Sequence, residues 1–246
     1  MNGILLRVGC DATTDGGCWN APVDPATWDY AYVPIPAEEA KHKHISECPT
    51  YGAFESRVER FKVHLPPNLS RAARVHLDPD FKSLTFGEPF DHRRKQLSSR
   101  GQIINQLEPG DFIAFYAAFR PTQPIQHRLA YCLFGFFYIE RKTLVNQLEH
   151  EARTRCAHGR REGAENDLVV WGIGGKSGRF ERAILIGEYR DKAYRVTRDI
   201  LNAWGELKVK NGYIQRSVRP PFFERPAQFL AWLQDRDESK NLVRDN

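Results

Sequence analysis

The stretch Leu107-Glu-Pro-Gly-Asp-Phe-Ile-Ala-Phe-Tyr-Ala-Ala-Phe-Arg-Pro121 decides the fold, together with Leu129-Ala-Tyr-Cys-Leu-Phe-Gly-Phe-Phe-Tyr-Ile139 shortly after it. Proline presets φ, glycine allows a positive φ and aspartate bonds its own backbone, so residues 109–111 are typical of a turn. Residues 112–119 and 129–139 are short, almost wholly apolar and rich in aromatics, which indicates strands buried on both faces. We therefore predict two central antiparallel strands, joined at one end by a basic polar loop.

Local patterns around these strands predict an α+β protein. Short apolar runs predict further strands at residues 4–8, 30–36, 166–172 and 183–187. Apolar spacing predicts helices at residues 51–64, 143–155, 197–204 and 227–233. Together these patterns favour one mainly antiparallel, curved sheet flanked by helices, in a single domain that spans residues 1–246. The charged tail from Gln234 is expected to fray.

The composition is that of a soluble globular protein with a mild basic excess. The chain has 246 residues, of which 27% are charged, and its net charge is +5. Such a charge permits an anionic partner, such as nucleic acid or a nucleotide, but does not demand one. The five cysteines form no Cys-x-x-Cys pair, and Arg7 and Asp11 come too early for a signal peptide. With no apolar run of about 18–20 residues, we expect a cytoplasmic protein without a membrane partner.

One group of potential metal ligands lacks the spacing of a zinc site. His42, His44 and Cys48 lie close together in the sequence. Zinc sites use three or four converging ligands, commonly in two local pairs, and here the second pair is missing. We therefore predict no zinc at these residues. Asp11, Asp15, Asn20 and Asp24 could hold a metal or a sugar hydroxyl, or they could simply favour turns, and the sequence leaves the cofactor unknown.

A glycine-rich segment resembles part of a phosphate-binding loop. It ends in Gly175-Lys-Ser177, but Val170 stands where that loop requires a glycine, and a strand pattern follows in place of a helix. We therefore reject the nucleotide-loop interpretation. Lys176 and Ser177 remain candidates for an anion site, because a glycine-rich hairpin can offer backbone N–H groups to an anion.

Acidic residues and histidines near the ends of predicted elements are candidates for catalysis. Asp11 comes after the N-terminal strand, Asp78 lies two residues after His76, and His158 follows the predicted helix at 143–155. Carboxylates and a histidine that meet at one end of a sheet could perform general acid–base chemistry, so Asp11, Asp78 and His158 are our catalytic candidates. The alternative is that Asp78-Pro79 only terminates a strand and that His158 is a polar residue at a helix end.

Two groups of arginines are candidate phosphate contacts. The first surrounds His158 and consists of Arg153, Arg155, Arg160 and Arg161, and the second, Arg120 and Arg128, bounds the central loop. If both groups face one site, they should bind the phosphates of a nucleic acid together. The alternative is a solvated surface, and we expect Arg160 and Arg161 to be exposed. Residues that could contact a base or sugar are Trp19, Asn20, Asp24 and Tyr116.

Several local motifs together resemble a known family. They are Gly9-Cys-Asp11, Trp19-Asn-Ala-Pro-Val-Asp24, Tyr32-Val-Pro-Ile-Pro36, His76-Leu-Asp-Pro79, Gly110-Asp111 with Phe115-Tyr116, Ala157-His158, and Lys176-Ser177 before Glu181-Arg-Ala183. In these motifs the chain resembles a nucleotide-modification-associated domain family, the third so named, over most of its length to about Gly187. The resemblance implies a connection to DNA or nucleotide base modification, but it implies no settled reaction.

The central strands also resemble those of PUA-like modified-base readers. That resemblance covers the central third of the chain and implies a curved sheet or a small barrel. Such readers hold a flipped base against aromatic side chains, for which Tyr116, Phe119 and Tyr131 are candidates. The alternative for each of these aromatics is packing in the core.

Three functions remain open on the sequence alone. The first is a module that binds nucleic acid or a nucleotide and recognises a modified base. The second is an enzyme that acts on a nucleobase or its sugar adduct with Asp11, Asp78 and His158. The third is an interaction protein whose basic surface only keeps it soluble. Convergence of the catalytic candidates on one place would favour the enzyme.

Overall fold

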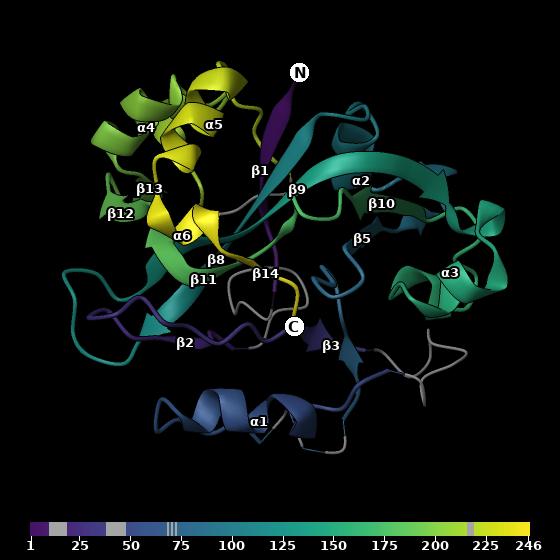
Figure 1. The fold of residues 1–246 in the computed structure, drawn as a ribbon, viewed down its shortest axis with the longest axis horizontal. Helices are drawn as coiled ribbons and strands as arrows, with labels where there is room; N and C mark the ends of the chain where they lie inside the picture. Colours follow the sequence, from purple (N-terminus) through teal and green to yellow (C-terminus); the bar gives the residue numbers. More distant parts are fainter. Residues whose placement is uncertain (10–18, 38–47, 68, 70, 72, 216–218) are drawn as a thin grey trace.

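The computed structural model describes residues 1–9, 19–37, 48–67, 69, 71, 73–215 and 219–246 (Figure 1). Its centre is the predicted pair of strands, β8 (Phe112–Pro121) and β9 (Ala130–Leu144), which run antiparallel with Phe112 opposite Tyr138. The predicted turn precedes β8: Gly110 has a φ of 90°, and the Asp111 carboxylate accepts a hydrogen bond from the backbone N–H of Glu108 at 2.9 Å. Both central strands are therefore confirmed.

One mainly antiparallel sheet is built around these strands. β1 (Gly3–Arg7) and β2 (Pro22–Val23) pair with β8 in parallel, while β11 (Gly178–Leu185) pairs antiparallel with the first half of β9. The second half of β9 pairs with β10 (Leu168–Gly172), which pairs in turn with β5 (Thr85–Glu88). The long strand β9 thus connects two regions of the sheet, and β5 lies at one end of the order β1-β8-β9-β10-β5.

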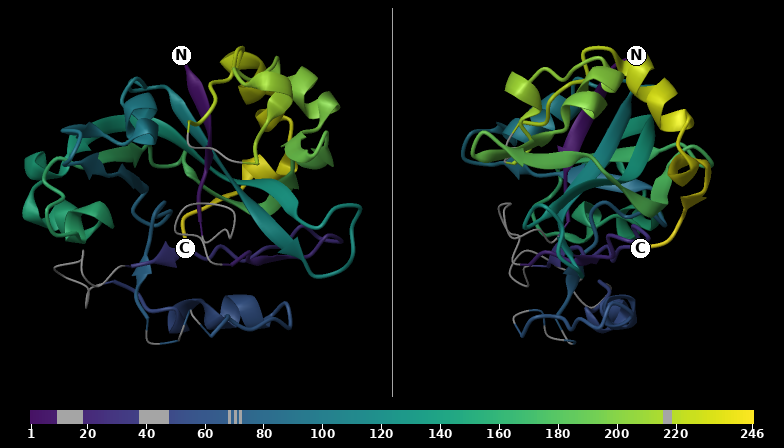
Figure 2. Two further views of the ribbon diagram at one scale, coloured as in Figure 1. Left: turned by 180° about the vertical axis from the view of Figure 1, so that it is seen from behind. Right: turned by 90° about the vertical axis from the view of Figure 1, so that its left-hand side faces the viewer.

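Alternate residues of β8 enter two separate cores, as expected for a strand buried on both faces. Ile113 and Phe115 belong to the core beneath residues 19–86, to which many side chains of that segment contribute. One of them is Phe54 of helix α1 (Gly52–Glu59). Phe112 and Tyr116 belong to the opposite core, which is covered by α4 (Arg198–Trp204) and α5 (Pro226–Gln234). Figure 2 shows α1 and this pair of helices at opposite ends of the molecule.

Short elements complete the structure. Among the described residues, three two-stranded antiparallel pairs lie outside the main sheet: β3 (Ile35–Pro36) with β4 (Val75–His76), β6 (Phe90–Asp91) with β7 (Gln96–Leu97), and β12 (Gly187–Arg190) with β13 (Ala193–Val196). The remaining helical segments are α2 (Ser99–Ile104), η3 (Val145–Gln147), α3 (His150–Thr154), η4 (His158–Arg160), η5 (Lys210–Gly212) and α6 (Asp237–Lys240). None of the helices within the described residues is both long and apolar enough to cross a membrane.

Several sequence predictions need correction. The sheet is not closed into a barrel, so the PUA-like barrel is not confirmed. The helix predicted at residues 143–155 is wrong over its first half, because β9 continues to Leu144 through its ladder with β10 and only His150–Thr154 is α-helical. The strand predicted at residues 30–36 is reduced to the two residues of β3.

The tail from Gln234 contains regular elements that contact the rest of the fold. α5 extends through Gln234 itself, α6 follows, and β14 (Leu242–Val243) pairs antiparallel with β11. The side chain of Asn246 accepts a hydrogen bond from the backbone N–H of Phe81 at 2.7 Å and donates one to Asp80 at 2.9 Å. These pairings offset the entropy of ordering a charged segment that the sequence alone gives no reason to order.

Candidate functional site

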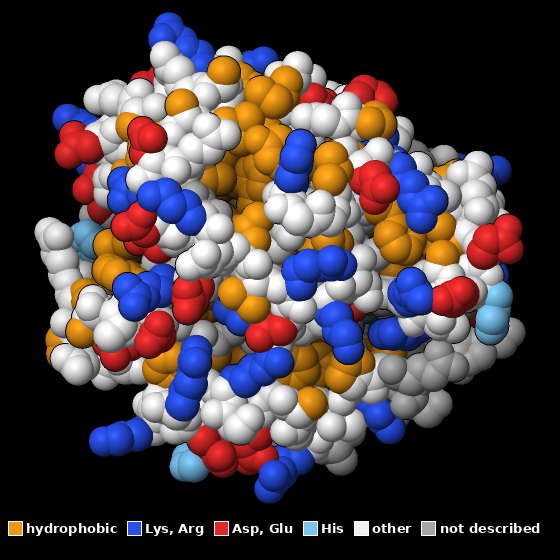
Figure 3. Space-filling model, in the orientation of Figure 1, with side chains coloured by type: hydrophobic (Ala, Val, Ile, Leu, Met, Phe, Trp, Pro, Cys, Tyr) orange, Lys and Arg blue, Asp and Glu red, His pale blue; other side chains and the backbone are white. Residues whose placement is uncertain are grey.

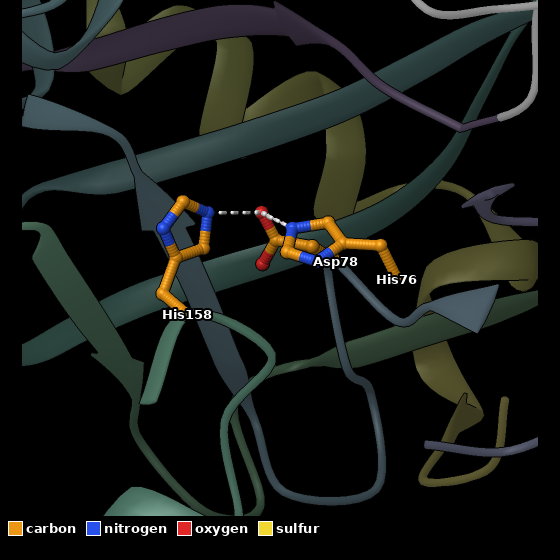
Figure 4. Close-up of side chains that lie close together, drawn as sticks. All are labelled: His76, Asp78 and His158. Atoms are coloured by element: carbon orange, nitrogen blue, oxygen red, sulfur yellow. Dashed lines mark ion pairs between the residues drawn. The ribbon is translucent and has the colours of Figure 1, made fainter. Parts of the chain in front are cut away.

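Three side chains that are far apart in the sequence meet in a buried cluster, which we call the His–Asp–His cluster: His76, Asp78 and His158. The Nε2 atom of His158 lies 3.6 Å from Oδ2 of Asp78, and the Nε2 atom of His76 lies 4.0 Å from the same oxygen. The side chains are only 3–9% exposed to solvent. Figure 4 shows the two imidazoles on either side of the Asp78 carboxylate.

The backbone of β5 fixes the carboxylate between the two rings. Asp78 follows β4, and its Oδ1 accepts a hydrogen bond from the backbone N–H of Gly87 at 2.9 Å. Its Oδ2 is thereby directed at His76 and His158. The same glycine makes room for His158, because a Cβ atom at position 87 would lie 2.2 Å from Cδ2 of that imidazole. Residue 87 must therefore be glycine if His158 is to keep this position.

A second carboxylate, Asp167, orients His158 from the other side of its ring. Nδ1 of His158 lies 2.7 Å from Oδ2 of Asp167, and because a carboxylate only accepts, Nδ1 carries the proton. Asp167 is itself held by the backbone N–H of Phe90 at 2.7 Å and by the Arg161 guanidinium at 3.2 Å. This arrangement directs Nε2 of His158 towards Asp78.

For both His158 and Asp78, burial shifts the pKa in one direction and the neighbouring polar groups shift it in the other. Burial disfavours the His158 imidazolium, but the hydrogen bonds and charges of Asp167 and Asp78 outweigh it and raise its pKa to about 9. Burial raises the pKa of Asp78, while the contacts with His158 and with the Gly87 N–H oppose that rise. Groups perturbed by burial together with specific charged partners are candidates for a functional site.

Two neighbouring polar groups are explained by the structure itself. Glu88 is buried beside the cluster, but it is paired with Arg100 and accepts a hydrogen bond from the Ser98 hydroxyl at 2.8 Å. The thiol of Cys156 is buried, and that burial raises its pKa to about 11, so it is a poor nucleophile at neutral pH. Neither group needs a ligand to account for its position.

The arginines around His158 contact the backbone or nearby carboxylates. Arg153 donates to the carbonyl of Val145 at 3.0 Å, and Arg160 donates to that of Thr154 at 2.8 Å. Arg155 pairs with Glu151, and Arg161 pairs with Asp167. The expectation that Arg160 and Arg161 are exposed is wrong, because both are partly buried. These contacts shape the segment that carries His158.

The two groups of arginines do not share one site. Arg120 and Arg128 bound the loop between β8 and β9, whereas η4 and α3 follow the opposite end of β9. Figure 1 shows this loop and α3 on opposite sides of the molecule. On the face shown in Figure 3, Lys and Arg are interspersed with Asp and Glu.

The glycine-rich hairpin divides its two candidate residues. Lys176 is exposed, whereas Ser177 is buried and its hydroxyl accepts a hydrogen bond from the backbone N–H of Tyr138 at 3.1 Å. The strand β11 begins directly after Ser177, at Gly178. The rejection of a phosphate-binding loop, which requires a helix at this point, is therefore confirmed.

The residues predicted to contact a base or sugar have partners within the protein. Asn20 is buried and donates to the carbonyl of Ala118 at 2.8 Å, and Asp24 accepts from the backbone N–H of Ala26 at 2.9 Å in a local turn. Trp19 packs against the core beneath residues 19–86. Tyr116 is fully buried, and its hydroxyl donates to the carbonyl of Ile214 at 2.9 Å. Core packing therefore accounts for this tyrosine.

The remaining candidates are placed as follows. Phe119 and Tyr131 are buried in the two opposite cores. Asp11 lies outside the described residues, so only Asp78 and His158 of the three catalytic candidates are seen to converge. His42 and His44 also lie outside them, whereas Cys48 is buried.

The sequence predicted only part of the cluster. Two of its members, Asp78 and His158, were catalytic candidates, and the third, His76, lies two residues before Asp78, a spacing that puts two residues of a strand on one face. Asp167 was missed as a site residue, because nothing in Asn166-Asp167 before β10 indicates that its carboxylate reaches back to His158. The only local signal in the sequence is an aspartate directly before an apolar run, and aspartates in ordinary turns commonly give the same signal.

Comparison with known proteins identifies a family. A family model described as nucleotide modification associated domain 3 matches residues 2–219, which include all members of the cluster and Asp167. No curated protein and no solved structure matches the chain.

Proposed function

The chain belongs to the nucleotide modification associated domain 3 family, and we propose that it is an enzyme that modifies a nucleobase or nucleotide at the His–Asp–His cluster. Family membership supports the substrate class, and the cluster supports a catalytic role. The residues assigned to this centre are His76, Asp78 and His158, with Asp167 as the residue that positions His158.

The observation that carries the proposal is the burial of these polar side chains around one carboxylate oxygen. Removing charged and polar groups from water costs free energy, and well-packed apolar residues are often at least as stabilising in their place. The surrounding cores are dense with aromatics, so the fold does not depend on this cluster for apolar packing. An arrangement that costs stability and directs two imidazoles at one oxygen is better explained by chemistry.

The same contacts favour an enzyme over a module that only reads modified bases. A reader needs exposed aromatics and cations, but Tyr116, Phe119 and Tyr131 are buried. Three of the arginines near His158 donate to carbonyl groups or to Asp167. His76, Asp78 and His158, by contrast, form a convergent set of groups that accept and donate protons or bind a cation, as an active site requires.

The test compares nucleosides before and after exposure to the protein. Clarified, undialysed extracts of cells that express the chain supply small-molecule co-substrates. They are incubated with DNA and with free nucleotides, each with and without base modifications, and the hydrolysed nucleosides are measured by mass spectrometry. The variant is Asp78→Asn, which keeps an acceptor for the Gly87 N–H. The matched control is Asp235→Asn, an exposed carboxylate at the end of α5.

The proposal predicts a nucleoside of changed mass with the parent chain and with Asp235→Asn, but not with Asp78→Asn. Circular dichroism must show that both variants are folded. A parent that changes no nucleoside in any of these mixtures, or a folded Asp78→Asn variant with the profile of the parent, would overturn the proposal.

A further inference from the structure

The His–Asp–His cluster presents a set of three possible metal ligands. The donor atoms of His76, Asp78 and His158 all lie within 4.8 Å of one another, and within the described part of the chain no other such group of histidine, cysteine and acidic side chains is present. Ligands at about 2.0–2.1 Å from a metal ion are separated from each other by about 3.0–3.5 Å. The two measured separations from Oδ2 of Asp78, 3.6 and 4.0 Å, are close to that range. Movement of the imidazoles towards Asp78 and towards each other would bring the three donor atoms to that spacing.

The surroundings of His158 match those of a metal-binding histidine. A ligating histidine characteristically donates its second ring N–H to a carboxylate or carbonyl, which fixes the tautomer and the orientation of the ring. Asp167 accepts from Nδ1 of His158 at 2.7 Å, so the lone pair of the neutral imidazole is on Nε2, which faces Asp78. Arg161 and the N–H of Phe90 hold Asp167 in turn. The structure therefore contains both the ligand and its support.

The charges also suit a cation. Two carboxylates flank His158, one on each ring nitrogen. Arg161 offsets the charge of Asp167, but the side of Asp78 that faces the imidazoles has no arginine or lysine within ion-pairing distance among the described residues. A divalent ion at this position would offset the charge of Asp78 and displace the Nε2 proton of His158, so that both imidazoles could coordinate it in their neutral form.

We propose that the His–Asp–His cluster binds a divalent transition-metal ion through Nε2 of His76, Oδ2 of Asp78 and Nε2 of His158. This inference deepens the proposed function and rests on the same site. Imidazole ligands favour zinc, iron, copper or nickel over magnesium and calcium. Two histidines and one carboxylate leave coordination positions for water or substrate, as in catalytic zinc and non-haem iron(II) sites. Asp167 is a positioning residue in this scheme.

The test measures metal binding without any nucleotide. The protein is freed of metal by chelation, and Co²⁺, Zn²⁺ and, under anaerobic conditions, Fe²⁺ are then titrated in separate experiments. Stoichiometry after desalting is measured by elemental analysis, and the environment of bound Co²⁺ by absorption and X-ray absorption spectroscopy. Variants are His76→Gln, Asp78→Asn and Asp167→Asn, and the matched control is the exposed histidine in His150→Gln.

The proposal predicts one tightly bound ion per parent chain, with imidazole scattering around Co²⁺. His76→Gln and Asp78→Asn should weaken binding at least about 100-fold, and Asp167→Asn about 10–100-fold through loss of its support for His158. His150→Gln should bind like the parent. A folded ligand variant with unchanged affinity, or a parent that binds none of these ions at micromolar concentration, would overturn the inference. If a variant does not fold, the parent alone decides: Co²⁺ spectra of the parent that show no imidazole ligands would also overturn the inference.

This experiment separates the inference from the proposed function. If the parent binds no metal but its nucleoside products still depend on Asp78, the metal inference fails and the function stands. If the parent binds metal through the cluster but alters no nucleoside, the proposed function fails and the metal site stands.

Discussion

Adding a single methyl group at Gly87 should displace His158 and disable the site, although no residue of the site is itself replaced. The new Cβ would lie 2.2 Å from Cδ2 and 2.6 Å from Cγ of the imidazole, whereas ordinary contacts are 3.4 Å or longer. Moving from 2.2 to 3.4 Å requires a displacement of about 1.2 Å. His158 is 3% exposed, so a movement of that size takes place within a packed interior.

The expected cost of Gly87→Ala follows from two contributions. Overpacking in a well-packed interior costs about 1–3 kcal/mol. A displacement of this size also breaks the 2.7 Å hydrogen bond between His158 and Asp167, and such charge-assisted bonds contribute about 1.5–3 kcal/mol. We expect a loss of about 3 kcal/mol in the free energy of unfolding, which is a large share of the roughly 5–15 kcal/mol of a typical protein.

The assay is denaturant unfolding of the parent, Gly87→Ala and Gly174→Ala. Gly174 is a matched control, because a Cβ there meets nothing within 4 Å, and this glycine has no positive φ. In a His158→Ala background the added methyl group meets no imidazole, so Gly87→Ala should cost less than about 1 kcal/mol. The reasoning is refuted if Gly87→Ala is as stable as Gly174→Ala, or if its cost is the same with and without the imidazole.

Three further predictions concern groups around the site. Arg161→Ala should lower the free energy of unfolding by about 1–2 kcal/mol, because it removes a charge-assisted bond to buried Asp167. Arg155→Ala should lower it by less than about 0.5 kcal/mol, because the pair of Arg155 with Glu151 is exposed. Equal losses for the two variants in denaturant unfolding would contradict this prediction. Asp167→Asn should lower the free energy of unfolding by about 2 kcal/mol through its weaker bond to His158, and an unchanged unfolding midpoint would be evidence against that bond. Asn246→Ala should cost about 1–2 kcal/mol by removing two hydrogen bonds to residues 80–81, and thermal unfolding indistinguishable from that of the exposed Asn241→Ala would show that the tail is not held there.

The parts of the fold that were predictable from sequence are those that local chemistry determines. The apolar runs at residues 112–119 and 129–139 are strands because they are buried on both faces, whatever lies around them. Helix α4 also follows its local signals: Thr197 occupies the N-cap, and Gly205 ends the helix with a φ of 69°. In these segments the local preference and the tertiary structure agree.

The errors arise where distant partners override local pattern. Leu144, Leu148 and Ala152 have helical spacing, but the backbone at Leu144 pairs with Leu168 of β10, which extends β9 instead. The charged tail pairs with β11 and accepts the Phe81 N–H through Asn246, and neither contact has a local signal. Tertiary pairing of this kind outweighs intrinsic preferences that amount to less than about 1 kcal/mol per residue.

The kinds of residue in the site were predictable from the sequence, but the particular set of residues that comes together was not. Asp78 and His158 were identified because carboxylates and histidines after strands and helices are chemically useful. Their convergence, and the participation of Asp167, depend on how β4, β5 and β10 bring separate segments together. The arginines show the opposite case: they are adjacent in sequence, but each is directed to a different carbonyl or carboxylate.

The central claim is that a nucleotide binds at the His–Asp–His cluster. NMR of the imidazole nitrogens, in protein labelled with ¹⁵N-histidine, tests this claim most directly. The chain has eight histidines, whose resonances can be assigned with single-site variants. Addition of mixed deoxynucleoside monophosphates, with and without base modifications, should shift the ring resonances of His76 and His158 and leave exposed His150 unchanged. Shifts confined to other histidines, or none at saturating nucleotide, would contradict the account.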